Sequence, residues 1–342
     1  MTYPWSWYSD PDVLRAEEER IFARSWHYVG HAGQLGRAGD YFTTVVGRTP
    51  LVVTRAHDGE VRALVNVCRH RGSVVAEGAG NVTTLQCPYH AWTYGLEGRL
   101  RAAPRATFDV ADVSLAPARL DTWGPFLFVT PNAGAAPLAH VLGDVPERVA
   151  ECGIDVDALR FHHRTEWTVE ANWKVVCENF LECYHCPVAH KGFSALVDVS
   201  PDAYRLEANG LVSSQFGPVR ANGHAAYDAA GEVSHGQYHF VWPATAVNIH
   251  PGRANLSIGT IAPAGPERAR RLLDYFFADG ADATWIEDLI AFDDEVGRED
   301  TVLVERVQRG VVSGAIADGR LIDGSEQLVE HFQSLVREAL ER

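Results

Sequence analysis

The stretch CRHRGSVVAEGAGNVTTLQCPYH (residues 68–90) contains two cysteines and two histidines, arranged as a C-x-H pair and a C-x-x-H pair. Short runs rich in β-branched and aromatic residues surround it, such as YFTTVV (41–46), VRALVNV (61–67) and FLFVT (126–130). The dipeptides Asp58-Gly59 and Glu97-Gly98 are typical of β-hairpin turns. The pattern predicts a small antiparallel β domain in which each Cys/His pair lies at a hairpin tip.

The four candidate metal ligands in this stretch are Cys68, His70, Cys87 and His90. One alternative is a structural zinc site, for which cysteines and histidines are an adequate ligand set. The other is a [2Fe-2S] cluster in which histidines replace the thiolates on one iron. The C-x-H spacing is unusual for zinc knuckles, so it favours the iron–sulfur cluster, which would receive electrons and pass them on.

The composition is that of a globular protein with an acidic balance. The 342-residue chain is 46% hydrophobic and 22% charged, with a net charge of −15. Its only lysines are Lys174 and Lys191, so we expect no nucleic-acid partner. The N-terminal MTYPWSWYSD lacks the basic start and apolar core of a signal peptide, and no apolar run is long enough to span a membrane. We therefore expect a cytoplasmic protein without a membrane partner.

A second group of metal-ligating residue types lies in CENFLECYHCPVAH (residues 177–190). The pattern predicts a helix over 169–186 that ends at the following proline, because the residue before a proline avoids the helical region. Three polar side chains would share one face of that helix: Glu178, Glu182 and His185. His190 lies beyond the proline and could approach the same point from another direction.

Two histidines and one carboxylate form the facial triad of non-haem Fe(II) oxygenases, which leaves coordination positions open for dioxygen. The candidate histidines are His185 and His190. The carboxylate has to come from another segment, and the predicted helix over 282–309 offers several. Asp293 and Asp300 both interrupt its apolar stripe on the inward side, and periodicity alone does not choose between them.

Cys183 and Cys186 form a C-x-x-C pair in the same stretch, a pattern found in redox and zinc sites. The predicted helix would hold both thiols off the face of Glu182 and His185, and the chain has no second C-x-x-C pair. We therefore interpret them as packing cysteines, with a redox or zinc pair as the alternative.

The remaining patterns predict an α+β protein. Helical periodicity is found in three further regions: 10–25, 282–309 and 324–341. Strand-like alternation extends over 203–262, and PNAGAAP (131–137) has the composition of a linker. We predict three parts: an N-terminal helix (1–37) that packs with the second domain, a β domain (38–132) and an α+β domain (133–342).

Several motifs resemble those of Rieske non-haem iron oxygenase α-subunits. CRHRG (68–72) and CPYHAWTY (87–94) resemble the two ligand loops of Rieske domains, and NWKVVCENFLECYHCPVAH (172–190) resembles the mononuclear-iron motif. The resemblance implies that Cys68, His70, Cys87 and His90 hold a Rieske [2Fe-2S] cluster. It also implies a β Rieske domain followed by a helix-grip type catalytic domain, with an antiparallel sheet flanked by helices.

The same resemblance assigns roles around the second iron. It makes His185 and His190 ligands of a mononuclear Fe(II). EDTVLVERVQRG (299–310) matches the family pattern from Asp300 onward, which implies that Asp300 is the third ligand and leaves Asp293 in reserve. Glu182 is implied to be the acid that links this iron to a Rieske histidine of a neighbouring subunit; many family members have aspartate there.

The family resemblance implies an enzyme that uses O2 and electrons from a separate reductase or ferredoxin. No G-x-G-x-x-G motif lies between a strand and a helix, so NAD(P)H would act only indirectly, through that partner. Family members assemble as trimers, which implies a homotrimer.

The substrate is less well defined by the sequence. Glu182 and the EDxxxxExVQRG pattern resemble the branch of choline, glycine-betaine and carnitine oxygenases, which implies hydroxylation or N-demethylation of a small molecule such as a quaternary ammonium compound. Four aromatic residues could surround such a cation: Phe193, Tyr238, Phe240 and Trp242.

Two other functions stay open. An aromatic ring-hydroxylating mono- or dioxygenase that acts on an aromatic or alicyclic acid would want an arginine in its pocket, for which the candidates are Arg205, Arg220 and Arg253. An electron-transfer Rieske protein without oxygenase activity would need only the first third of the chain.

Overall fold

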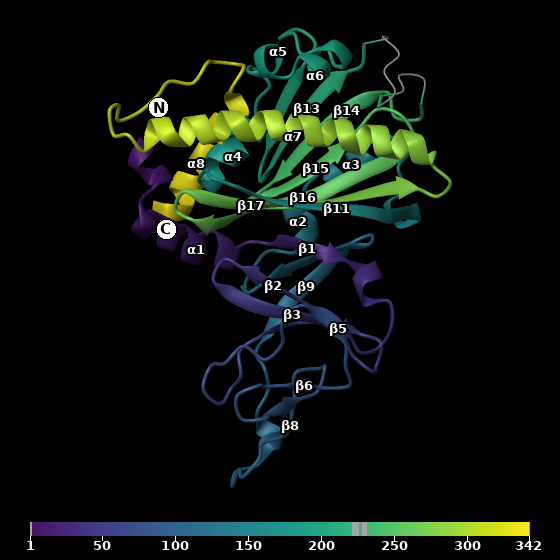
Figure 1. Ribbon diagram of the computed structural model, residues 1–342, viewed down its shortest axis with the longest axis vertical. Coiled ribbons are helices and arrows are strands. Elements are labelled where there is room, and N and C mark those ends of the chain that lie inside the picture. The colour runs from purple at the N-terminus through teal and green to yellow at the C-terminus, as the bar shows by residue number, and fades with distance from the viewer. Residues whose placement is uncertain (1, 221–225, 228–230, 342) are drawn as a thin grey trace. The chain divides into compact units, whose positions relative to one another are not determined.

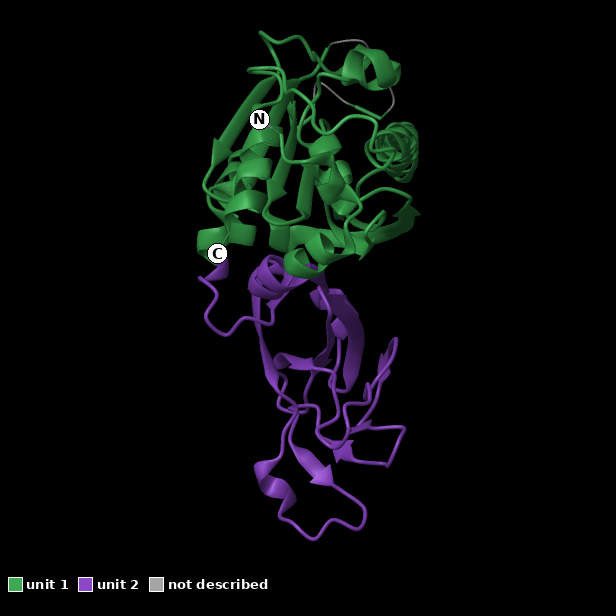
Figure 2. Cartoon of the chain, turned by 90° about the vertical axis from the view of Figure 1, so that its left-hand side faces the viewer, with its two compact units in different colours: residues 1–17, 139–342 green, residues 18–138 purple. Residues whose placement is uncertain are grey.

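The computed structural model describes residues 2–220, 226–227 and 231–341. The chain forms two compact units, residues 1–17 with 139–342 and residues 18–138 (Figure 2). The observed boundary near residue 17 differs from the predicted one at residue 37. Residues 18–37 belong to the β unit because strand β1 (His27–His31) pairs with β10 (Phe126–Thr130).

The smaller unit contains a seven-stranded sheet of order β1-β10-β9-β4-β3-β2-β5 and a three-stranded sheet of order β6-β7-β8 (Figure 1). Its other strands are β2 (Asp40–Val46), β3 (Thr49–Arg55), β4 (Val61–Val65), β5 (Ala79–Asn81), β6 (Leu85–Gln86), β7 (Thr93–Tyr94), β8 (Leu100–Ala102) and β9 (Pro117–Trp123). Asp58-Gly59 connects β3 to β4, and Glu97-Gly98 connects β7 to β8. All the strand pairs are antiparallel, which confirms the predicted β domain.

The larger unit is built on a seven-stranded antiparallel sheet of order β11-β17-β16-β15-β14-β13-β12. The strands are β11 (Leu159–Val169), β12 (Arg205–Asn209), β13 (Val212–Pro218), β14 (His235–Val241), β15 (Thr245–Ile249), β16 (Asn255–Gly265) and β17 (Arg268–Ala278). The sequence did not predict β11 and β17. Their alternation is hidden by charged residues that pair across the two strands, such as Arg270 with Glu166.

Helices complete the α+β architecture. Figure 1 shows α7 (Ala283–Val311) crossing one face of the sheet, where Ile286 and Leu289 pack against Leu273 and Phe277 of β17. The other α-helices are α1 (Pro11–Arg20), α2 (Leu138–Leu142), α3 (Val145–Glu151), α4 (Trp173–Phe180), α5 (Cys186–Ala189), α6 (Lys191–Leu196) and α8 (Gln327–Glu341). Short 3-10 turns are η1 (Trp5–Tyr8), η2 (Phe22–Arg24), η3 (Ala32–Leu35), η4 (Val110–Asp112) and η5 (Val156–Ala158). None of the described helices is long and apolar enough to cross a membrane.

The predicted single helix over 169–186 is wrong. Asn172 caps α4 by accepting the Lys174 N–H, and the helix ends at Phe180. The Glu182 carboxylate then accepts the backbone N–H groups of Tyr184 and His185, which a continuing helix would have bonded to its own carbonyls. The proline that was expected to end the helix lies instead in the first turn of α5.

Because the helix breaks, Glu178 does not share a face with Glu182 and His185. It lies in a buried network in which Tyr3 and Tyr8 donate to its carboxylate, at 2.5 Å and 2.8 Å. Burial raises the pKa of Glu178, and the hydrogen bonds from the two tyrosines oppose that rise. The network holds the N-terminal segment within the larger unit.

A second buried contact joins the same two segments. Lys174 Nζ lies 2.6 Å from Glu17 Oε1, both side chains are fully buried, and Trp173 Nε1 donates to Glu17 Oε2 at 2.7 Å. Burial raises the pKa of Glu17 and lowers that of Lys174, while their mutual attraction opposes both shifts.

We expect Lys174→Met to lower the free energy of unfolding by about 3–5 kcal/mol, because it leaves the buried Glu17 without its cation. Denaturant unfolding of the purified variant measures this loss. Because an apolar pair of similar volume is often tolerated, the double variant Lys174→Met with Glu17→Leu should recover much of the stability. Equal stability of the single variant and the parent would contradict the expectation.

Candidate active site

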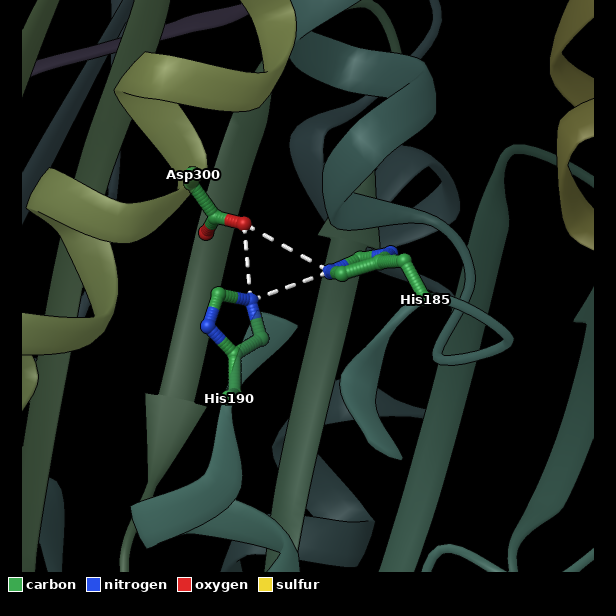
Figure 3. A group of neighbouring side chains, drawn as sticks. All are labelled: His185, His190 and Asp300. Atoms are coloured by element: carbon green, nitrogen blue, oxygen red, sulfur yellow. Dashed lines mark hydrogen bonds and ion pairs between the residues drawn. The ribbon is translucent and has the colours of Figure 1, made fainter. Parts of the chain in front are cut away.

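Three side chains from the 177–190 stretch and from α7 meet at one point (Figure 3). The Nε2 atoms of His185 and His190 are 3.1 Å apart, and Asp300 Oδ1 lies 2.9 Å from His190 Nε2 and 3.5 Å from His185 Nε2. Donors in neighbouring positions around one metal, each about 2.1 Å from it, are about 3 Å apart. The three atoms therefore fit one face of a coordination sphere, with the donor types of a mononuclear iron site.

A carboxylate orients each histidine from its other ring nitrogen. His185 Nδ1 contacts Glu182 Oε1, and His190 Nδ1 lies 2.7 Å from Glu299 Oε2. A proton on each Nδ1, donated to these carboxylates, leaves the Nε2 lone pair free to bind a metal. Glu299 was not predicted as a site residue, although it directly precedes Asp300 in the sequence.

The electrostatics of this cluster favour positive charge at its centre. Burial disfavours the charged form of His185, but hydrogen bonds with Asp300 and Glu182 outweigh it and raise the pKa of His185 to about 9. Burial likewise opposes the charge of Asp300, yet hydrogen bonds from the two histidines hold its pKa well below the usual range. A divalent cation supplies the positive charge that such a site stabilises.

The two candidate aspartates of α7 lie in different surroundings. Asp293 Oδ2 accepts a hydrogen bond from Tyr275 at 2.6 Å, and Asp293 Oδ1 lies 3.8 Å from His250 Nε2. Asp293 is two helical turns, about 10 Å along the axis, from Asp300. The structure thus brings Asp300, and not Asp293, to the histidines. Periodicity could not distinguish the two aspartates, because residues seven positions apart lie on nearly the same face of a helix.

A cavity of about 600 Å³ borders the three-residue cluster. Its wall includes the aromatic residues Trp167, Phe180, Phe193, Tyr204, Tyr227, Tyr238 and Tyr275. Phe193 and Tyr238 were predicted to line a substrate site. Phe240 and Trp242 do not line this cavity; their rings pack against Phe332 instead.

The charged residues of the cavity wall differ from those suggested by the sequence. Arg271 and Arg298 line it, whereas Arg205, Arg220 and Arg253 are not among its lining residues. Arg205 pairs with Glu207 and Arg220 pairs with Asp198. Asp293 and Asp294 also line this cavity. Burial and the neighbouring Asp293 raise the pKa of Asp294, and the nearby Arg298 opposes that rise.

In the smaller unit, the four predicted cluster ligands form two pairs. The rings of His70 and His90 are 4.7 Å apart between centroids, and the Cys68 and Cys87 thiols lie within hydrogen-bonding reach of each other. Both thiols are buried and both imidazoles are exposed. A [2Fe-2S] cluster with thiolates on one iron and imidazoles on the other needs this arrangement.

Two aromatic residues support this second site. Trp92 stacks on His70, with centroids 4.8 Å apart. Tyr94 was not predicted as a site residue. Its hydroxyl lies 3.3 Å from Cys68 Sγ and accepts the Arg69 N–H at 3.0 Å. These contacts fix the loop around Cys68, and a hydrogen bond to a cluster thiolate is one of the means by which proteins tune reduction potential.

The interpretation of Cys183 and Cys186 as packing cysteines is wrong in one respect. Both are buried in an apolar cluster with Phe193 and Tyr238, but they also form a disulfide. The reason is the break after α4, which places the two residues around a turn, with Cα atoms 4.9 Å apart.

A β domain with paired cysteines and histidines, joined to a domain with two histidines and an aspartate at a cavity, defines a Rieske-type iron oxygenase. Residues 25–113 match the family described as the Rieske [2Fe-2S] domain, and residues 156–342 match the ring hydroxylating alpha subunit (catalytic domain). The chain belongs to the family of ring-hydroxylating α-subunits and is a Rieske non-haem iron oxygenase.

Known relatives cover nearly the whole chain. It is 33% identical to the chloroplastic choline monooxygenase of Amaranthus tricolor, over 99% of this chain and 78% of that protein. It is 33% identical to the carnitine monooxygenase oxygenase subunit of Acinetobacter baumannii, over 98% of this chain and 94% of that one. A solved quaternary ammonium Rieske monooxygenase superposes with a TM-score of 0.88 at 31% identity, covering 99% and 95% of the two chains. Naphthalene 1,2-dioxygenase from Rhodococcus sp. shares the fold, with a TM-score of 0.83 at 19% identity over 100% and 95% of the chains.

Proposed function

We propose that this protein is the oxygenase component of a monooxygenase that oxidises a small quaternary ammonium compound at a carbon next to nitrogen. The observation that carries the proposal is the wall of the cavity at His185, His190 and Asp300. It combines aromatic rings with two carboxylates, Asp293 and Asp294, alongside Arg271, which lies over the Trp167 ring, and Arg298. Aromatic faces and carboxylates attract a cation that cannot donate hydrogen bonds. The names of the choline and carnitine relatives support the same substrate class.

In this proposal, His185, His190 and Asp300 hold a mononuclear Fe(II), and Cys68, His70, Cys87 and His90 hold the [2Fe-2S] cluster. When bound, the mononuclear iron would supply O2 activation, with electrons that arrive one at a time through the cluster. Glu182 and Glu299 keep the protons of the two histidines on Nδ1. The aromatic wall excludes water from the oxidised carbon and positions the cation.

Electrons would come from a separate reductase or ferredoxin that itself uses NAD(P)H. The two metal sites of one chain lie in different compact units. A homotrimer closed head to tail would let the cluster of one subunit serve the iron of the next. A solved relative is described in terms of inter-subunit electron transfer, which supports this arrangement. Glu182 would then link the iron ligand His185 to a Rieske histidine of the neighbouring subunit.

Glu182→Gln is expected to keep both metals but to lower turnover by about 10- to 100-fold. The amide oxygen can still accept from His185 Nδ1, whereas the negative charge that the link between subunits needs is lost. Iron content measures whether the mononuclear iron is retained, the EPR signal of the reduced protein measures whether the cluster is retained, and product formation measures turnover. Unchanged turnover would contradict a role of Glu182 in electron transfer between subunits. Glu182→Ala serves as the comparison, because it should also lower iron content by releasing His185.

A single-turnover experiment tests the proposed function without the unidentified reductase. The iron-loaded protein is reduced with dithionite, freed of reductant, and exposed to O2 with choline, carnitine or, as the competing aromatic acid, benzoate. We expect oxidised product from an ammonium compound and none from benzoate. Product from benzoate alone would favour the aromatic ring-hydroxylating alternative, and product from none, with both metal sites loaded, would contradict the proposal.

A further inference from the structure

A disulfide joins Cys183 to Cys186, and neither the iron site nor the cluster site uses it. The other four cysteines of the chain are free. The bond joins residues only three positions apart in the sequence, and closing so short a loop restricts the unfolded chain little. Its main effect is therefore local, on the folded protein. The two residues that it encloses are Tyr184 and the candidate iron ligand His185.

The backbone of both iron-site histidines is attached to this loop. His185 lies inside it, and the N–H of His190 donates to the carbonyl of Cys186 at 2.8 Å. The N–H of Cys186 in turn donates to the carbonyl of Cys183 at 3.2 Å. The position of Cys186 is thus passed on to both histidines. A shift of the loop would therefore change how both imidazole rings meet a metal.

The carboxylate that orients His185 also depends on the loop. Glu182 directly precedes Cys183, and its side chain accepts the backbone N–H groups of Tyr184 and His185. The same carboxylate contacts His185 Nδ1. These contacts are made only while the loop keeps both N–H groups turned toward Glu182. Loss of such an orienting contact typically lowers metal affinity by about 10- to 100-fold.

The surroundings of the two sulfur atoms leave them little room. Cys183 is 7% exposed and Cys186 is 5% exposed, and both pack in an apolar cluster with the rings of Phe193 and Tyr238. A disulfide holds its sulfurs about 2 Å apart, whereas two thiols settle at the ordinary non-bonded distance of about 3.5–4 Å. Because protein interiors are closely packed, the loop backbone or the aromatic neighbours have to move when the bond is reduced.

A small molecule can reach the disulfide, because Cys183 and Cys186 line the cavity of about 600 Å³ at the iron site. A dithiol reduces such a bond in two exchange steps. One thiolate of the reagent attacks a sulfur, which releases one cysteine and leaves a mixed disulfide, and the second thiol then displaces the other cysteine. The Cys183–Cys186 bond breaks, a disulfide forms within the reagent, and the two thiol hydrogens end on the two cysteine sulfurs.

We propose that the Cys183–Cys186 pair is a thiol–disulfide switch of the mononuclear iron site. The disulfide keeps His185 and His190 in the arrangement that binds Fe(II), and reduction by a dithiol weakens that binding. This inference rests on the iron assignment within the proposed function, and it adds control of that site by the redox state of the surrounding thiols. Cys183 and Cys186 are positioning residues, because they act on the iron through the two histidines.

The test uses the full-length protein with its cluster intact, treated with dithiothreitol in the absence of O2 and then freed of the reagent. Alkylation followed by mass spectrometry counts the free thiols at Cys183 and Cys186. Competition with a chromogenic chelator measures the dissociation constant of Fe(II). We expect this constant to rise at least about tenfold on reduction and to return when the oxidant diamide re-forms the disulfide. Acid-labile sulfide and the Rieske EPR signal should not change.

Variants assign the effect to this pair of cysteines. The double variant Cys183→Ser with Cys186→Ser removes the disulfide without a reagent. It should bind Fe(II) as weakly as the reduced parent, and dithiothreitol should not weaken the binding further. The matched control is Cys177→Ala, because Cys177 is a buried free cysteine of the same unit and does not line the cavity. It should keep both the affinity of the parent and its response to dithiothreitol. The measurement on the parent decides the matter even if the double variant does not fold.

The outcomes distinguish this inference from the proposed function. Equal Fe(II) affinity of the disulfide and dithiol forms, with both free thiols counted, would overturn the switch and leave the iron site standing. A disulfide that dithiothreitol does not reduce in the folded protein would also overturn it. So would a loss of affinity on treatment of the double variant that equals the loss in the parent. A protein that binds no mononuclear Fe(II) in either form would overturn the iron assignment and the switch together.

Discussion

An Asp300→Ala variant is expected to lose its mononuclear iron and its turnover while it keeps the EPR signal of the reduced Rieske cluster. Asp300 Oδ1 is the only oxygen among the three converging donor atoms and lies within 3.5 Å of both imidazole Nε2 atoms. Without it, the remaining histidines present a weaker, incomplete ligand set. We expect iron affinity to fall by more than about 100-fold, since even residues that only orient a ligand contribute up to that much.

Total iron, acid-labile sulfide and EPR after reduction with dithionite provide the measurement. Iron should decrease from about three to about two per chain, with sulfide unchanged, because the cluster contains two of each. Glu287→Ala is the matched control, since Glu287 is an exposed acid on the same helix α7. Loss of the cluster signal in a folded Asp300→Ala protein, or full retention of the third iron, would contradict separate sites with Asp300 as a ligand.

The converse result is expected for Cys87→Ala, with loss of the Rieske signal and of both cluster irons and retention of the mononuclear iron. Cys87 is buried beside Cys68, and these are the two cysteines of the smaller unit, so that unit offers no further thiol to replace Cys87. Turnover should fall below detection because the remaining iron would receive no electrons. Metal and sulfide analysis, with single turnover of the variant, measures these losses.

Cys177→Ala is the control for Cys87→Ala, because Cys177 is a buried free cysteine of the larger unit. It should keep both metal sites. Should Cys87→Ala retain sulfide and a Rieske EPR signal, the assignment of the four cluster ligands would be wrong. Zinc in the parent protein, bound in place of iron and sulfide, would lead to the same conclusion.

The fold and the metal-ligand candidates of the smaller unit were the features that the sequence predicted best. The spacing of Cys68, His70, Cys87 and His90 is a local property, because hairpin tips bring residues within a few positions of each other together. The antiparallel β fold followed from alternation and turn residues alone. The contact of Tyr94 with Cys68 could not be predicted in this way, since it depends on how the two loops pack.

The secondary structure of the larger unit was predicted less completely from the sequence. The helices near 282–309 and 324–341 were predicted correctly, but the helix over 169–186 was not. Propensity favoured its continuation, and a side-chain contact, Glu182 with the N–H groups of Tyr184 and His185, ends it. Because the helix breaks, Glu178 lies in a buried network with Tyr3 and Tyr8, away from Glu182 and His185, and Cys183 lies next to Cys186.

The sequence by itself determined the kinds of donor atoms, their local spacing and the two-domain α+β architecture, because these depend on residue type and on periodicity within short segments. The family resemblance implied Asp300, which periodicity could not distinguish from Asp293, and the tertiary structure places Asp300 beside the histidines. Only the tertiary structure decided that Glu299 contacts His190 and that His250 and Asp293 face each other across a gap. Each of these relations joins residues from segments far apart in the chain. Their distances are fixed by how α7 packs on the sheet, which no local pattern encodes.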